Sequence, residues 1–319
     1  MSDLPAAIEI EEQGPREGFQ IEPGPIATPD KIALIDALSA TGLKRIQVAS
    51  FVNTRLVPGW ADAEAVVAGF TPKPDVKYTA LFFNESGMKR AMAFHNRLTL
   101  EGYVALSASE AFLKKNMHRE RDAHMEAQRA TIRSHQAAGV PVNGLLIMAS
   151  FGCNFSGDVT AQNVLDAVQD GMALAEEFGL TYDYVGIADS MGWATPQRVA
   201  RAVGAVRERW PELEVSLHLH DTRGLGIANA YEGLRLGVTK FDATVGGLGG
   251  CPFAEQPGAP GNIASEELVL LCQEMGIETG VDLDALIEAG RLAERVIGHP
   301  LPSAALRAGS LDSFRRRVA

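Results

Sequence analysis

The chain has 319 residues, of which 46% are hydrophobic, and its formal net charge at pH 7 is −11. This composition is typical of a globular protein, and the excess of acidic residues disfavours nonspecific binding to nucleic acid or anionic membranes. No apolar run approaches the roughly 20 residues that span a bilayer, and the N-terminus has no secretory-signal pattern. We therefore expect a cytoplasmic enzyme without a nucleic-acid or membrane partner.

Short β-like runs alternate with amphipathic stretches along most of the chain. Strands are predicted over residues 6–11, 45–51, 77–83, 99–107, 142–149, 182–188, 214–220 and 240–245. A helix is predicted to begin at Thr28-Pro29, and further helical patterns lie near residues 62–70, 86–95, 119–138, 160–178, 196–209, 225–236 and 265–275. A Thr-Pro pair is typical of a helix start, because Thr caps the helix and Pro fits its first turn.

This alternation predicts a parallel sheet with crossover helices. Eight such units favour a closed (β/α)₈ (TIM) barrel over an open doubly wound sheet. We expect a catalytic barrel domain over residues 1–276 and a short C-terminal helical extension with a tail over residues 277–319. The extension should contain a helix near 282–297, and the three arginines at 315–317 should lie in a solvated tail.

His218 and His220 lie at the end of the seventh predicted strand, where barrel enzymes place their chemistry. Alternate side chains of a strand share a face, so the two imidazoles should point the same way and could bind a divalent metal. The alternative is a pair of partly buried histidines that are satisfied by hydrogen bonds.

A second candidate lies just after the first strand, where Arg16 and Glu17 are flanked by glycines in GPREGFQ (14–20). The carboxylate could bind a hard cation, and the guanidinium could stabilise an oxyanion. The alternative is a surface turn with a solvated charge pair. Asp189 follows the sixth strand, where it is either functional or the N-cap of the next helix.

The third candidate is the glycine-rich stretch GGLGGCP (246–252), which follows the eighth strand and contains Cys251. Its glycines permit close backbone approach, so the stretch could hold a phosphate or act as a lid.

Cys272 lies in an apolar run and is predicted to pack in the core, whereas the role of Cys153 stays open. Because the ends of parallel strands face one mouth of a barrel, we expect a set of candidate side chains to converge there: Arg16, Glu17, Asp189, His218, His220 and Asn262.

The same residues resemble hydroxymethylglutaryl-CoA lyase, within the DRE-TIM metallolyase superfamily. The likeness covers about residues 8–297, and GPREGFQ (14–20), SASEAFLKKN (107–116), HLHDTRG (218–224), GGLGGCPFA (246–254) and GN (261–262) carry it. The resemblance implies a (β/α)₈ barrel with a C-terminal helical extension, a carbon–carbon lyase activity on an acyl-CoA, and a homodimer.

The resemblance also implies roles for individual residues. The implied ligands of a divalent cation, Mg²⁺ or Mn²⁺, are Glu17, His218, His220 and Asn262. The implied catalytic residues are Arg16, which would stabilise the enolate of acetyl-CoA, Cys251, which would transfer a proton, Asp189, which would lie near the substrate's hydroxyl and carboxylate, and Gln47.

Substrate and CoA binding are predicted for Gln20, Asn84, Lys114 and Lys115. The two lysines, with Arg119 and Arg121 beyond them, could contact the CoA phosphates, and the alternative is a solvated face.

Two positions depart from the lyase pattern. Glu17 stands where the lyases have Asp, and Gln47 stands where they have Glu. The second change removes a negative charge beside Arg16, so a related substrate such as citramalyl-CoA is an alternative to hydroxymethylglutaryl-CoA. The remaining alternatives are a Claisen-type synthase, a CoA-independent metal aldolase and a non-catalytic binding barrel.

Overall fold

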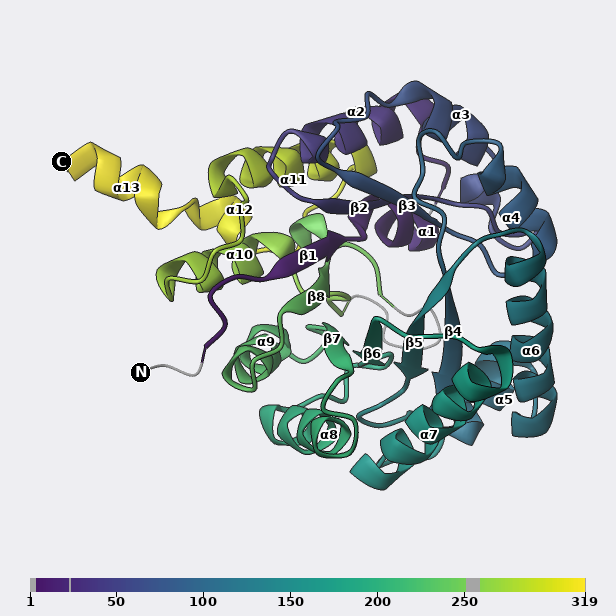
Figure 1. Cartoon of the computed structure of the whole chain (residues 1–319). Coiled ribbons are helices and arrows are strands. Elements are labelled where there is room, and N and C mark those ends of the chain that lie inside the picture. Colours follow the sequence, from purple (N-terminus) through teal and green to yellow (C-terminus); the bar gives the residue numbers. More distant parts are fainter. Residues whose placement is uncertain (1–3, 23, 251–258, 319) are drawn as a thin grey trace. The chain divides into compact units, whose positions relative to one another are not determined.

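A computed structural model describes residues 4–22, 24–250 and 259–318 of the chain (Figure 1). The strands of this part are β1 (Glu9–Glu12), β2 (Arg45–Ser50), β3 (Lys77–Leu81), β4 (Gly102–Ser107), β5 (Val142–Met148), β6 (Tyr184–Ala188), β7 (Glu214–His218) and β8 (Lys240–Ala243). They lie within about three residues of the predicted strands, so the predicted alternation holds along the whole described chain.

Helices lie between the strands and after them. The longer helices are α2 (Thr28–Ser39), α3 (Ala63–Gly69), α4 (Glu85–Met92), α5 (Glu110–Met117), α6 (Arg121–Ala137), α7 (Ala161–Phe178), α8 (Pro196–Arg209), α9 (Gly226–Arg235), α10 (Ser265–Glu274), α11 (Leu283–Ile297) and α13 (Leu311–Val318). The short turns are the π-helix η1 (Gly14–Gly18), α1 (Phe19–Ile21), η2 (Pro58–Trp60), η3 (Val245–Gly247) and α12 (Ala305–Ala308).

The strands form a sheet of order β3-β2-β1-β8-β7-β6-β5-β4. β1, β2 and β3 pair in parallel, and so do β4, β5, β6 and β7. Parallel strands joined by helices are the architecture of the (β/α)₈ barrel. The β2–β3 register shifts between Gln47 and Ala49, which marks a bulge in β2.

The chain divides into two compact units, which we describe separately. The first unit contains residues 100–241, and the second contains residues 6–99, 242–250 and 260–319. In the first unit Leu145 and Ile147 of β5 have no exposed surface, and neither have Val164 and Val168 of α7. Helices α7 and α8 pack against each other (Figure 1). Strands that helices cover become buried on both faces and therefore read as continuous apolar runs.

In the second unit α2 and α3 pack on β2, and α11 packs on α2. Leu34 and Leu38 of α2 meet this core, as do Ile46 and Val48 of β2, all with no exposed surface. Asp282 caps α11 by accepting a hydrogen bond from the backbone N–H of Ala285 at 3.0 Å, which satisfies a donor that the first helical turn leaves open.

Two local features differ from the sequence prediction. Helix α5 was not predicted; Ser109 caps it by accepting from the backbone N–H of Phe112 at 3.2 Å. The three C-terminal arginines lie on a helix, α13, which has no buried residue and forms ion pairs from Arg315 to Glu274 and from Arg316 to Asp284. Of the helices in the described residues, none has the length and apolar character that a bilayer span requires.

Candidate active site

The two predicted histidines lie together at the end of β7. His218 is the last residue of the strand, and its Nε2 lies 3.2 Å from Nε2 of His220. The ring planes meet at 63°, and His220 is buried, with 4% of its surface exposed. Because the strand turns both side chains to one face, their ring nitrogens converge on one point, as the predicted metal site requires.

Arg16 and Glu17 lie in the π-helical turn η1, directly after β1. Single π-helical turns often occur at functional sites. The Arg16 guanidinium donates from Nε to Oε1 of Gln47 and from Nη2 to Oε1 of Gln13, the second at 2.7 Å. Its Nη2 also lies 3.1 Å from Oε2 of Glu17. Gln13 has 7% of its surface exposed and was not identified from the sequence, because a glutamine before a turn carries no signal of its own.

Asn262 lies beside Glu17, as the predicted ligand set requires. Its Nδ2 donates to Glu17 Oε1 at 2.9 Å and to the backbone oxygen of Leu248 at 3.0 Å. Its Oδ1 is buried and has no hydrogen-bond partner among the described residues. A Cβ on Gly249, where φ is +86°, would lie 2.8 Å from this Nδ2, so the close approach depends on glycine. A buried acceptor without a donor is costly, and a cation would satisfy it.

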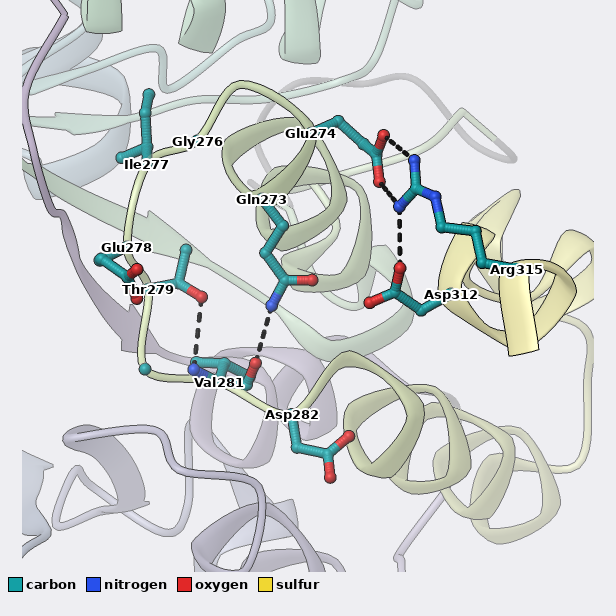
Figure 2. Close-up of a pocket in the computed structure, with 11 residues that line it drawn as sticks. Gln273, Glu274, Gly276, Ile277, Glu278, Thr279, Val281, Asp282, Asp312 and Arg315 are labelled. Carbon is teal, nitrogen blue, oxygen red and sulfur yellow. Dashed lines mark hydrogen bonds and ion pairs between the residues drawn. The ribbon is translucent and has the colours of Figure 1, made fainter. Parts of the chain in front are cut away.

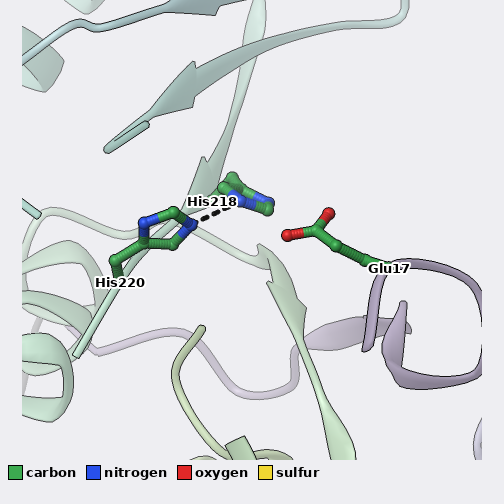
Figure 3. A group of neighbouring side chains, drawn as sticks. All are labelled: Glu17, His218 and His220. Atoms are coloured by element: carbon green, nitrogen blue, oxygen red, sulfur yellow. Dashed lines mark hydrogen bonds between the residues drawn. The ribbon is translucent and has the colours of Figure 1, made fainter. Parts of the chain in front are cut away.

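Figure 3 draws the imidazole rings of His218 and His220, which belong to the first unit, and the carboxylate of Glu17, which belongs to the second. These are three of the four predicted ligands. Imidazole nitrogen and carboxylate oxygen both occur among the protein ligands of divalent first-row metals.

Asp189 directly follows β6 and is buried, with 1% of its surface exposed. Its Oδ1 accepts hydrogen bonds from the backbone N–H groups of Trp193 at 2.7 Å and Ala194 at 3.0 Å. Its Oδ2 is buried without a described partner, and burial raises the pKa of this carboxyl to about 6. The N-cap of α8 is Thr195, so the alternative that Asp189 caps this helix is wrong.

Two buried carboxyl groups hold the start of the glycine-rich stretch. Oε1 of Glu12 accepts from the backbone N–H groups of Gly14 at 2.7 Å and Val245 at 2.9 Å, and its Oε2 accepts from Ser265 Oγ at 2.5 Å. Glu266 accepts from the backbone N–H of Gly246 with both oxygens, at 3.0 and 2.9 Å. Burial raises the pKa of Glu12 to about 7 and also raises that of Glu266.

Sequence reasoning did not identify either carboxyl group, because Val245 and Ser265 are more than 230 residues from Glu12 and Gly246 is 20 residues from Glu266. Cys251, the predicted proton donor of this stretch, lies outside the described residues.

The predicted substrate-binding residues have varied surroundings. Oε1 of Gln20 is buried without a described partner. Asn84 caps α4 by accepting from the backbone N–H of Gly87 at 2.9 Å. Lys114 and Lys115 are exposed on α5, where Lys114 pairs with Glu120 at 2.6 Å. A role for these four residues in substrate binding stays a prediction.

The predicted core position of Cys272 is confirmed, since the side chain has no exposed surface and burial raises its pKa to about 12. Cys153, whose role the sequence left open, is buried against Phe112, Ala149 and Met191.

A pocket of about 440 Å³ lies in the second unit, between the end of α10 and α13 (Figure 2). Arg315 on its rim pairs with Glu274 and Asp312, each at 2.8 Å. None of the predicted site residues lines this pocket.

A barrel that places candidate ligands for a divalent cation after its strands is typical of metal-dependent barrel enzymes. Comparison with known proteins makes the class specific. The family model described as HMGL-like matches residues 7–293. The hydroxymethylglutaryl-CoA lyase YngG of Bacillus subtilis is 37% identical over 299 residues, which cover 94% of this chain and 96% of the relative. A 3-hydroxy-3-isohexenylglutaryl-CoA/hydroxy-methylglutaryl-CoA lyase of Pseudomonas aeruginosa is 36% identical over 306 residues, which cover 96% of this chain and 98% of the relative.

Comparison with solved structures indicates the same class of enzyme. The HMG-CoA lyase structure from Bacillus subtilis has a TM-score of 0.86 at 35% identity and covers 97% of this chain and 99% of its own. The HMG-CoA lyase structure from Acinetobacter baumannii, in complex with coenzyme A and 3-methylmalate, has a TM-score of 0.84 at 36% identity, with 97% of each chain covered.

The chain belongs to the HMGL-like family, and it is a carbon–carbon lyase on a (β/α)₈ barrel. The predicted family, fold class and enzyme class are therefore confirmed.

Proposed function

We propose that the chain cleaves a 3-hydroxy-3-methylglutaryl-CoA-like substrate to acetyl-CoA and a keto product, with a divalent cation in the active site. The names of the relatives support the acyl-CoA substrate, and the coenzyme A in the Acinetobacter baumannii structure supports the thioester carrier. The proposed ligands are Glu17, His218, His220 and Asn262.

The buried Oδ1 of Asn262 carries this proposal, because it is an acceptor without a described donor beside Glu17. The amide oxygen of Asn262, the carboxylate of Glu17 and the imidazole nitrogens of His218 and His220 would hold a divalent cation such as Mg²⁺ or Mn²⁺, since oxygen and imidazole ligands suit these ions. When bound, the cation supplies positive charge that orients the substrate and stabilises its hydroxyl oxygen as that oxygen loses a proton.

Two residues would transfer protons during the reaction, and a third would stabilise the negative charge that develops. The buried Oδ2 of Asp189 would accept the hydroxyl proton, since its other oxygen is fixed by two backbone donors. As the carbon–carbon bond breaks, Arg16 would stabilise the enolate oxygen of the departing acetyl group; losing one such donor typically costs about 3–4 kcal/mol. Cys251 would then protonate the enolate carbon.

The lysines of α5, Lys114 and Lys115, together with Gln20 and Asn84, are proposed to contact the substrate or its CoA portion. Exposed ammonium groups can bind phosphate without further change in the fold. We also propose a homodimer in the cytoplasm, which size-exclusion chromatography with light scattering and cell fractionation would test.

The decisive experiment is a screen of 3-hydroxyacyl-CoA thioesters with Mg²⁺ and with Mn²⁺, in which released acetyl-CoA is measured. We expect cleavage that stops when the cation is chelated and returns when either cation is added back. A Claisen-type synthase would instead consume acetyl-CoA in the presence of a 2-oxo acid, and a CoA-independent aldolase would cleave free hydroxy acids. Absence of acetyl-CoA release from every thioester would contradict the proposal.

A further inference from the structure

We propose that Gln13 and Gln47 determine substrate specificity, because they hold Arg16 with neutral amides and so admit an acyl-CoA whose carboxylate is bonded directly to the hydroxyl-bearing carbon. The proposal rests on the function proposed above and specifies its substrate class. Cleavage of such an acyl group would release a 2-oxo acid and acetyl-CoA.

Arg16 is held on two edges by these amides. Its Nε donates to Oε1 of Gln47, and its Nη2 donates to Oε1 of Gln13 at 2.7 Å. Both glutamines are buried: Gln47 has 8% of its surface exposed and Gln13 has 7%. Since the guanidinium is planar and presents its donors in a fixed fork, two acceptors on different edges fix its orientation.

Each glutamine is itself fixed by the backbone around it. Gln13 occupies the N-cap position of η1, yet its side chain does not cap that turn. Its backbone N–H donates to the carbonyl oxygen of Ala243 in β8 at 2.9 Å. Gln47 lies where the register of β2 shifts, and bulges of this kind redirect side chains near active sites. The contacts with Arg16 are therefore built into the start of η1 and into β2.

The charge of this arrangement is the basis of the inference. A carboxylate at either position could accept the same hydrogen bond, but it would pair with the Arg16 charge. An amide orients the guanidinium and leaves its charge uncancelled. Among the described residues, Glu17 forms an ion pair with Arg16 at 3.1 Å, and the charge of Glu17 would be shared with the cation.

A substrate carboxylate on the reacting carbon would approach Arg16 more closely than one placed a methylene further away. A Glu at position 13 or 47 would repel the nearer carboxylate more strongly, because the interaction of two charges falls with distance. Neutral amides remove this repulsion. Neutral residues at positions 13 and 47 therefore favour binding of the acyl group whose carboxylate is bonded directly to the hydroxyl-bearing carbon.

The test compares citramalyl-CoA with 3-hydroxy-3-methylglutaryl-CoA, which have the same charge and differ by one methylene. For the Mg²⁺-loaded enzyme we expect a higher kcat/KM for citramalyl-CoA. Gln47→Glu should lower that kcat/KM by at least roughly tenfold and shift the ratio of the two substrates at least roughly threefold toward the longer one. Gln13→Glu should act in the same direction, so the test does not depend on one variant.

Two controls separate charge from position. Gln47→Met removes the acceptor without adding charge, so it should lower both activities and leave their ratio unchanged. Gln169→Glu is the matched surface control, since exposed Gln169 accepts from Arg209 Nη2 at 2.7 Å, and it should change neither value. Calorimetric binding of the free acids citramalate and 3-hydroxy-3-methylglutarate to the Mg²⁺-loaded protein supplies a readout without turnover.

The outcomes are distinct. If the enzyme cleaves neither thioester, the proposed function fails. If it cleaves them but prefers the longer substrate, or if neither Glu variant shifts the ratio, the specificity inference alone is overturned. A shift in Gln47→Met equal to that in Gln47→Glu would also overturn it, because charge would then not be the cause.

Discussion

Replacing Glu12 by glutamine should stabilise the protein at alkaline pH and have little effect at acid pH. Glu12 has no exposed surface, and burial raises its pKa from 4.5 to about 7. A glutamine of the same shape could keep the network. Its oxygen would accept from the backbone of Gly14 and Val245, and its amide would donate to Ser265 Oγ.

The magnitude follows from the raised pKa. Between about pH 4.5 and 7 the folded protein keeps a proton on Glu12 that the unfolded chain releases, so this group's contribution to stability falls as pH rises. At about 1.4 kcal/mol per pH unit, the loss amounts to about 3 kcal/mol once the pH exceeds 7. The amide of a glutamine has no proton to release in this range, so the substitution removes this loss. We expect Glu12→Gln to be more stable than wild type by about 2–3 kcal/mol at about pH 8 and nearly equal to it at about pH 5.

The measurement is the urea midpoint and the Tm of both proteins at about pH 5 and about pH 8. A gain of this size raises Tm by roughly 3–5 °C, because a chain of 319 residues unfolds with an entropy of about 2.1 cal/mol/K per residue. Glu9→Gln is the matched control, because Glu9 is exposed on the same strand, and it should show no such pH-dependent difference. If Glu12→Gln changed stability equally at both pH values, the buried-carboxyl explanation would be refuted.

Three further substitutions test the proposed chemistry. His220→Ala should abolish cation-dependent turnover while the circular dichroism spectrum stays that of wild type, and undiminished activity would refute its role as a ligand. Asn262→Ala should weaken cation binding in calorimetry by about tenfold or more, because the buried Oδ1 is lost; unchanged affinity would exclude it from the ligand set. Asp189→Asn should lower kcat by about 100-fold or more at unchanged cation content, and an unaffected kcat would show that another group accepts the proton.

The sequence predicted the fold because the strands of a barrel are recognisable one at a time. β5 was predicted over 142–149 and is Val142–Met148, since its residues are mostly apolar, as expected for a barrel strand that is covered on both faces. β1 was placed too early, because Ala7 forms only an isolated bridge, with Glu278, ahead of the strand. Helix α5 was not predicted, although Ser109 and Glu110 form a typical helix start.

Candidate site residues could be predicted from the sequence where the residue type and its position relative to a strand indicate a function. Residues whose role depends on partners elsewhere in the fold could not be predicted in this way. The pairing of His218 with His220 follows from strand periodicity, and Arg16 with Glu17 from a turn after a strand. Glu12 became visible only through Ser265, 253 residues away, and Gln13 only through the position of the Arg16 side chain. A glutamine or a strand-end glutamate is ordinary in a sequence, and only the fold gives it a partner.

Two sets of buried side chains, the acids Glu12 and Glu266 and the amides Gln13 and Gln47, explain how this site combines rigidity with charge. Glu12 and Glu266 accept hydrogen bonds from backbone N–H groups of η1 and of the stretch after β8, so neutral donors fix these segments. Gln13 and Gln47 fix the guanidinium without any anion of their own. Buried acids therefore hold the backbone, whereas neutral amides hold Arg16. Exchanging these roles would place negative charge where the proposed mechanism forms the substrate's oxyanion, so we expect the distribution of acids and amides to matter for catalysis.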